Sequence, residues 1–176
     1  MTTPPQTPGF DYIVKGNVSI KKLSKHKYNI TFSKIGKFLM YQVWDKDNVN
    51  NMNDQRYVAY VSAKKWVSAF QQTNAFLDKN SEPLFTPTTI MEIENDNYAF
   101  VIDKIFFDRR DRIVFTVSTK HISPSNNSSK KLIKIPNGNF NHVRFDIDID
   151  STTCMIALLL PIGLAGGAAG RCFASI

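Results

Sequence analysis

Cysteine is scarce in this sequence, whose 176 residues contain only Cys154 and Cys172. So few cysteines exclude a disulfide-rich scaffold, and the fold must rest on a core of buried side chains. The first residues show neither the basic segment nor the apolar run of a secretory signal. We therefore expect cytoplasmic synthesis and reduced cysteines, while a disulfide closing the segment between them is the alternative in an oxidising compartment.

Residues able to catalyse a reaction or hold a metal ion are also few. The three histidines, His26, His121 and His142, lie far apart and outside any HExxH pattern. Neither cysteine is spaced from a histidine as zinc ligands are, and no nucleophile elbow is present to make a serine reactive. The sequence therefore indicates a protein that is not an enzyme, and we expect no catalytic residue, metal, cofactor or small-molecule substrate.

One acidic pattern is a candidate cation site. Asp146, Asp148 and Asp150 alternate with isoleucines, so all three carboxylates project from one face of an expected strand. Carboxylates are ligands that Ca²⁺ prefers, but the glycine and the terminal glutamate of an EF-hand loop are missing. Neighbouring carboxylates on such a face stand about 6 to 7 Å apart. A solvated strand face is the preferred interpretation.

Positive charge is concentrated in the first third of the chain. The net charge is +7, and residues 1–65 carry eleven Lys or Arg against four Asp or Glu. The candidate polyanion contacts are Lys21, Lys22, Lys25 and Lys27. Tyr28 beside them could stack on a base, but no RRM, KH or zinc-finger pattern accompanies them. We expect weak polyanion contact through charge alone, without nucleic acid as the partner.

Alternating apolar and polar residues dominate the middle of the chain. This period of two, interrupted by turn residues such as Asn95-Asp96 and Asn137-Gly138, predicts strands joined as hairpins. The alternation divides residues 97–107 into two strands, 97–103 and 104–107. The sequence predicts a mainly β fold, an antiparallel β-sandwich of about nine strands with one short helix and an apolar C-terminal tail.

The single expected helix covers residues 62–72. Ser62 can cap it, and Trp66, Val67 and Phe70 recur at helical spacing on one face. We expect this helix to cover one end of a sheet. The chain then divides into a proline-rich arm (1–9), a sandwich domain (10–150) and a Gly/Ala-rich tail (151–176).

The tail contains one long uncharged run. From Cys154 to Gly170 no side chain carries a charge, a hydroxyl or an amide. Pro161 interrupts the run, and 17 residues is the minimum for a membrane-spanning helix, although its glycines recur at a spacing typical of helix contacts in lipid. The alternative is an extended tail that occupies a groove or adds a strand to an adjacent subunit. The expected contact residues are Met155, Ile156, Leu158, Leu159, Leu160, Ile162, Gly163, Leu164, Gly166, Gly167 and Gly170.

Residues 28–149 resemble a family of small bacterial-type β proteins of unknown function. The resemblance rests on six short segments of the chain. They are Tyr28–Phe32, the tryptophan helix ending at Phe70, Asn74-Ala75 with Leu77, Tyr98–Val101, Ile113–Val117 and Val143–Ile147. Because these are strand and core positions, the resemblance implies a β-sandwich fold and no activity. Members of such a family are usually secreted, whereas no leader is visible here, so localisation stays open.

These observations favour a structural role. We expect a non-enzymatic protein that self-associates into a homomeric shell, fibre or filament through its arm and its apolar tail. The alternative is a protein that associates with or inserts into a membrane through the Gly/Ala-rich tail.

Overall fold

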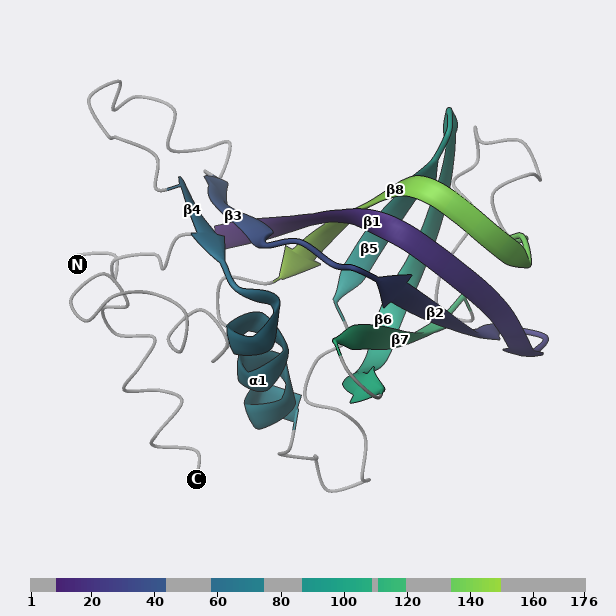
Figure 1. The fold of residues 1–176 in the computed structure, drawn as a ribbon, viewed down its shortest axis with the longest axis horizontal. Helices are drawn as coiled ribbons and strands as arrows, with labels where there is room; N and C mark the ends of the chain where they lie inside the picture. The colour runs from purple at the N-terminus through teal and green to yellow at the C-terminus, as the bar shows by residue number, and fades with distance from the viewer. Residues whose placement is uncertain (1–8, 44–57, 75–86, 109–110, 120–133, 150–176) are drawn as a thin grey trace, which may run out of the picture.

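The computed structural model describes residues 9–43, 58–74, 87–108, 111–119 and 134–149. These residues form eight strands and one helix (Figure 1). In chain order the elements are β1 (Gly9–Ser24), β2 (Lys27–Ser33), β3 (Phe38–Val43), β4 (Val58–Val61), α1 (Ala63–Asn74), β5 (Thr88–Ile93), β6 (Asp96–Asp108), β7 (Arg112–Ser118) and β8 (Gly138–Ile149).

All eight strands belong to one antiparallel sheet in the order β2-β7-β6-β5-β8-β1-β3-β4. An additional pairing between β2 and β1 joins the first strand of this order to the sixth, so six strands close into a ring. The sheet branches along β1, because Gly9–Ile13 pairs with β3 whereas Asn17–Ser24 pairs with β2. β3 and β4 therefore extend from one end of the ring, away from the turn between β1 and β2 (Figure 1).

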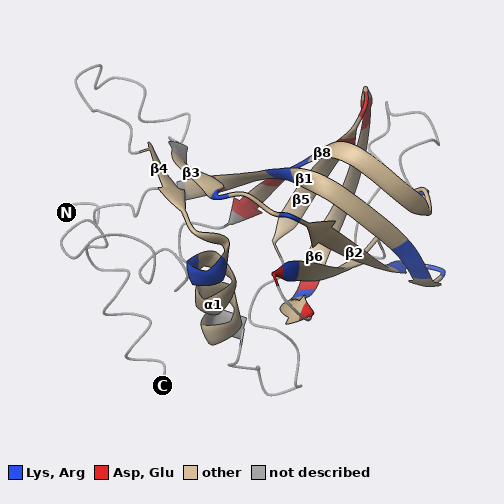
Figure 2. Cartoon of the chain, in the orientation of Figure 1, with Lys and Arg blue, Asp and Glu red and all other residues tan. Residues whose placement is uncertain are grey.

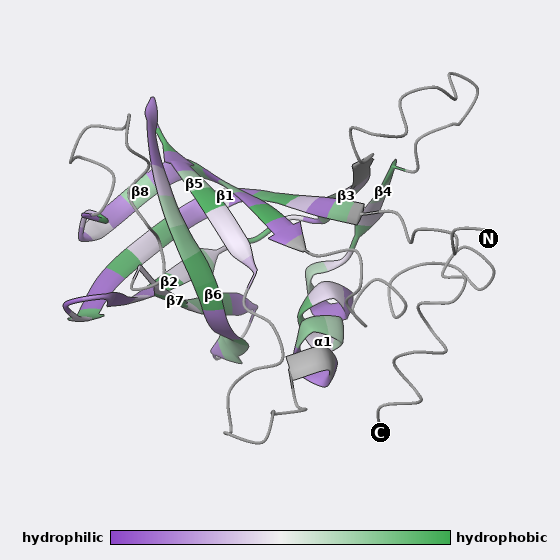
Figure 3. Cartoon of the chain, turned by 180° about the vertical axis from the view of Figure 1, so that it is seen from behind, coloured by the Kyte–Doolittle hydropathy of each residue, from purple (hydrophilic) through white to green (hydrophobic). Residues whose placement is uncertain are grey.

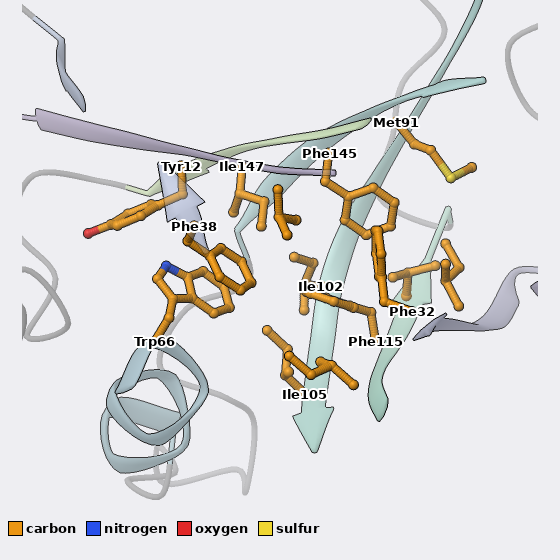
Figure 4. Packing of buried hydrophobic residues seen from close by; sticks show 14 of the residues in the cluster. Tyr12, Phe32, Phe38, Trp66, Met91, Ile102, Ile105, Phe115, Phe145 and Ile147 are labelled. Carbon is orange, nitrogen blue, oxygen red and sulfur yellow. The ribbon is translucent and has the colours of Figure 1, made fainter. Parts of the chain in front are cut away.

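The ring encloses an aromatic core. Alternate residues point inward, so hydrophobic and hydrophilic segments alternate along the strands (Figure 3). Phe32, Phe115 and Phe145, from three different strands, lie edge to face with ring centroids 4.7 to 5.5 Å apart (Figure 4). Each of these side chains is fully buried. Such edge-to-face pairs add to the free energy gained by removing the aromatic surface from water.

The predicted helix is confirmed, including its cap. Lys65 donates its backbone N–H to Ser62 Oγ at 3.2 Å, and Trp66 N–H donates to the Ser62 carbonyl at 2.9 Å. Trp66 is fully buried and stacks on Phe38 of β3, with ring centroids 4.2 Å apart and planes 6° from parallel (Figure 4). The helix therefore covers the core where β3 leaves the ring.

The mainly β, antiparallel fold with one short helix is confirmed. The apolar faces expected to pack against each other as a sandwich belong to one sheet that curls and closes on itself. The division of residues 97–107 into two strands is wrong, because β6 is continuous from Asp96 to Asp108. Its register shifts between Ile102 and Lys104, where the sequence suggested a break. The arm up to residue 8 and the tail lie outside the described residues.

Candidate functional site

The outer edge of β4 is the clearest candidate for an interaction site. Every strand of the ring has a neighbour on both sides, and β3 lies between β1 and β4. Among the described residues, no strand pairs with the outer edge of β4. Backbone N–H and C=O groups along an open edge are a template for another strand. The branch of the sheet therefore ends in one surface suited to strand addition.

The side chains of this edge strand are also unusual. Val58 and Tyr60 are 60% and 71% exposed, the two highest values among the large hydrophobic side chains of the described chain. Val61, at the end of the same strand, is buried and leads directly into Ser62 and α1. The edge is thus held on the core at one end while its apolar side chains face outward.

The four sequence-predicted lysines gather at the opposite end of the molecule. Lys21, Lys22, Lys25 and Lys27 are all exposed and surround the turn between β1 and β2, where Ser24 pairs with Lys27. Figure 2 shows this positive segment at the far end of β1 from β3 and β4. Leu23 is 48% exposed among the lysines. The turn therefore presents one apolar side chain within a cationic surface.

An acidic cluster lies on the outer face beside the branch of the sheet. Asp11 of β1 pairs in register with Asp148 of β8, and Asp146 projects from the same face. The Tyr41 hydroxyl of β3 lies 3.2 Å from Asp11 Oδ2 and 3.3 Å from Asp146 Oδ1. Arg144 contacts Asp146 at 3.7 Å. One tyrosine and one arginine thus approach three carboxylates.

Burial and the neighbouring carboxylates change the acidity of Asp11 in this cluster. The pKa of Asp11 is raised from 3.8 to about 7. Burial is the largest cause, followed by the charge of Asp148, the hydrogen bond between Asp11 and Asp148, and the charge of Asp146. The hydrogen bond from Tyr41 acts in the opposite direction. Among the described residues, no group of three His, Cys, Asp or Glu side chains is arranged to hold a metal ion. Asp150, the third member of the sequence pattern, lies outside the described residues.

Sequence reasoning missed several of these features. It grouped Asp146 with Asp148 by strand alternation but not with Asp11 or Tyr41, which come from distant parts of the chain. It also did not show that Val58 and Tyr60 lie on the strand that ends the sheet. No local pattern contains that information, because it depends on which strands become neighbours.

The expected tail contacts, from Met155 to Gly170, all lie outside the described residues. Within the described residues, no helix combines the length and apolar character needed to cross a membrane. Comparisons with protein-family models, with curated proteins and with solved structures find no match. The resemblance to a small bacterial-type β family therefore stays a prediction.

Proposed function

We propose that this protein is a non-enzymatic structural subunit that associates with further copies of itself. The proline-rich arm and the apolar tail are the segments that we expect to reach a neighbour. The outer edge of β4 is the surface that we expect to receive such a segment. The single observation that carries this proposal is the outer edge of β4, which pairs with no strand of the described chain and bears the exposed side chains of Val58 and Tyr60.

Strand addition is the physical mechanism that this edge supports. An extended segment placed along β4 would bond to the backbone groups of its outer edge, while alternate side chains would contact Val58 and Tyr60. The tail offers Met155, Ile156 and Leu158 to Leu160 before Pro161 interrupts it. Proline is tolerated at an edge strand but not in the middle of a sheet. Each Å² of apolar surface removed from water contributes about 25 cal/mol to association.

The proposal is tested by measuring particle size with analytical ultracentrifugation. Full-length protein should sediment as an oligomer, whereas a chain ending at residue 150 should sediment as a monomer. Tyr60→Lys combined with Val58→Lys should also give monomers, because lysines on an edge oppose strand pairing. Ile90→Lys is the matched control, since Ile90 is 49% exposed on β5, whose two edges are both paired.

The outcomes separate assembly from its alternatives. If the shortened chain or the edge variant keeps the oligomer of the full-length protein, self-association through these segments is wrong. If Ile90→Lys dissociates the oligomer as fully as the edge variant, charge rather than the β4 edge controls assembly.

Membrane association is the second candidate function, and the exposed Leu23 among the lysines at the β1–β2 turn favours it. Lysines attract an anionic lipid surface, and an apolar side chain at a turn can enter its interface. Co-sedimentation with vesicles of about 30% phosphatidylserine tests this candidate. The assay is run at about 50 to 200 mM salt, with the unaltered protein and with the variant Leu23→Ser. Binding that survives the higher salt and is lost in the variant or with the tail would favour the membrane over assembly.

A further inference from the structure

A pocket of about 550 Å³ lies beside the beginning of α1. Its walls come from three places: the loop after β2, the first turn of α1, and the end of β6 with the turn into β7. The volume is within the range of small-molecule sites, about 300 to 1,000 Å³. Nothing in the assembly proposal uses this pocket, so its ligand is a separate question.

Three cations from three different elements line the pocket. Lys34, Lys64 and Arg112 contribute positive charge, and Asp111 is the only acidic residue among the described residues of the lining. Figure 2 shows a blue segment in the first turn of α1, where Lys64 lies. Arg112 also contacts Asp108 at 3.5 Å, but both side chains are nearly half exposed, so this pair is weak and Arg112 can turn to a ligand.

The start of the helix adds hydrogen-bond donors to these cations. Ala63 and Lys64, the first two helical residues, both line the pocket. Trp66 N–H donates to the carbonyl of the cap residue Ser62, and Ser62 Oγ accepts the N–H of Lys65. The N–H groups of Ala63 and Lys64 therefore have no partner within the helix. They are donors at the positive end of the helix dipole, where an anion is stabilised.

The charge pattern of this helix turn is otherwise unfavourable. The first turn of α1 contains no acidic residue, and its second and third residues are Lys64 and Lys65. Lysines at this position repel the positive end of the helix dipole. A bound anion would offset this repulsion, because its negative charge would attract both the positive end of the helix dipole and Lys64. The sequence of the turn is thus suited to a helix start with an anion beside it.

The lining also includes two large apolar side chains, and two of its charged residues have left-handed backbone angles. Ile35 is partly buried, and Phe107 is 41% exposed although it is a large aromatic residue. Lys34 and Asp111 line the same pocket with left-handed backbone angles, φ of 55° and 71°. Non-glycine residues in this conformation are disfavoured and concentrate at ligand sites. The pocket lining thus contains both cationic and apolar side chains.

We propose that this pocket binds a small, water-soluble phosphate monoester that carries an apolar or aromatic group. The phosphate would lie against Lys34, Lys64, Arg112 and the first N–H groups of α1. The apolar group would contact Phe107 and Ile35. A dianionic phosphate fits this site better than a carboxylate, because it can accept bonds from all three cations and from the helix start together.

Isothermal titration of the full-length protein tests the site with two probes, phenyl phosphate and inorganic phosphate. We expect saturable binding of both, with phenyl phosphate at least about fivefold tighter because only it reaches Phe107. Lys64→Gln and Arg112→Gln should each weaken phenyl phosphate about tenfold, as expected for the loss of a charge-assisted contact. Phe107→Ala should weaken phenyl phosphate but leave inorganic phosphate unchanged.

Lys65→Gln is the matched control, because Lys65 is exposed on the same helix turn but does not line the pocket. It should bind both probes as the unaltered protein does. Equal weakening by Lys65→Gln and Lys64→Gln would overturn the proposal, since binding would then follow overall charge. No saturation of either probe below about 10 mM would also overturn it. Binding to vesicles of phosphatidic acid without binding to phenyl phosphate would contradict a soluble ligand.

The thermal midpoint of a variant shows whether a substitution removes only a ligand contact or also damages the fold. Lys64→Gln removes a cation from the positive end of the helix dipole, so the thermal midpoint should stay the same or rise while phosphate affinity falls. A fall in midpoint parallel to the fall in affinity would mean that the lysine supports the fold, and would overturn its assignment to the pocket.

Discussion

The closed ring and the β3–β4 extension belong to the same hydrogen-bonded sheet, but they bury their side chains in different ways. The six strands of the ring pair with one another and cover a shared aromatic core. β3 and β4 instead depend on α1, whose Trp66 lies against Phe38. Closure leaves the ring strands without an open edge. The extension keeps one, which explains why the candidate interaction surface is found there.

Trp66 connects these two regions. Its ring lies within 6.4 Å of four aromatic rings, centroid to centroid: Tyr12, Phe38, Phe70 and Phe115. The junction is imperfect, because Trp66 Nε1 and the Tyr12 hydroxyl are buried and have no hydrogen-bond partner among the described residues. Unpaired buried polar atoms cost free energy, so the large apolar contact must outweigh them. Aromatic contact at Trp66 thus adds to the backbone pairing of β1 with β3 in holding the junction together.

Replacing this tryptophan should have the largest effect. Trp66→Ala removes the contacts that join β3 and α1 to the ring, and we expect a loss of about 3 to 5 kcal/mol in the free energy of unfolding. Urea unfolding monitored by circular dichroism measures this loss. If the ring is stable by itself, the aromatic near-ultraviolet signal of the junction should disappear before the strand signal.

Tyr60→Ala is the control for this substitution, because Tyr60 is an aromatic residue of the extension that is 71% exposed. We expect a change within about 0.5 kcal/mol, as is usual for surface positions. Equal losses for Trp66→Ala and Tyr60→Ala would mean that the extension is not joined to the ring through Trp66.

The parts of this structure that the sequence could predict are those that depend on a pattern of neighbouring residues. Tyr28, Ile30 and Phe32 alternate with polar residues, and all three are buried as alternation requires. The helix could also be found, since Ser62 supplies its cap and Trp66 and Phe70 lie one turn apart. In each case the signal is contained in a few consecutive residues.

The ring closure and the acidic cluster could not be predicted in this way. Closure depends on β2 pairing with both β1 and β7, and Thr31 accordingly faces Ser19 on one side and Val114 on the other. Asp11 faces Asp148 across 137 residues of sequence. Such long-range pairings are decided by the fit of the whole core rather than by any one strand. The pocket beside α1 depends on the same tertiary arrangement.

Two glycines, one before β2 and one after it, differ in how much room the surrounding atoms leave for a side chain. Gly16 lies where the sheet branches, and a Cβ built there would be 3.0 Å from Phe32 Cδ1. At Gly36, in the loop before β3, a Cβ would meet no atom within 4 Å. We expect Gly16→Ala to cost about 1 to 3 kcal/mol through crowding of the core. Gly36→Ala should be neutral or stabilise by about 0.4 to 1 kcal/mol.

Differential scanning calorimetry of Gly16→Ala and Gly36→Ala measures the thermal midpoints that this prediction compares. Gly16→Ala combined with Phe32→Leu should recover part of the crowding cost relative to Phe32→Leu alone, since the smaller side chain leaves room for the methyl group. Similar midpoints for Gly16→Ala and Gly36→Ala would show that the branch point is as loosely filled as the loop.

The smallest expected effect concerns the outer face of the junction, where Asp11 lies between Tyr41 and Asp148. Burial and the neighbouring carboxylates raise the pKa of Asp11 from 3.8 to about 7. Between these values the folded protein holds a proton that the unfolded chain has released, so stability falls as the pH rises from about 4 to 7. Because the site is partly exposed, we expect the fall attributable to Asp11 to be about 1 kcal/mol.

Asp11→Asn should remove this fall, so that the variant is more stable than the unaltered protein at pH 8 and similar to it at pH 4. Tyr41→Phe should act in the opposite sense, because it removes the hydrogen bond that lowers the pKa of Asp11. Urea midpoints at each pH unit from about 4 to 8 compare the three proteins. Parallel profiles for Asp11→Asn and the unaltered protein would contradict a raised pKa. The carboxylates on the outer face would then not oppose the aromatic contacts and the β1–β3 pairing that join the extension to the ring.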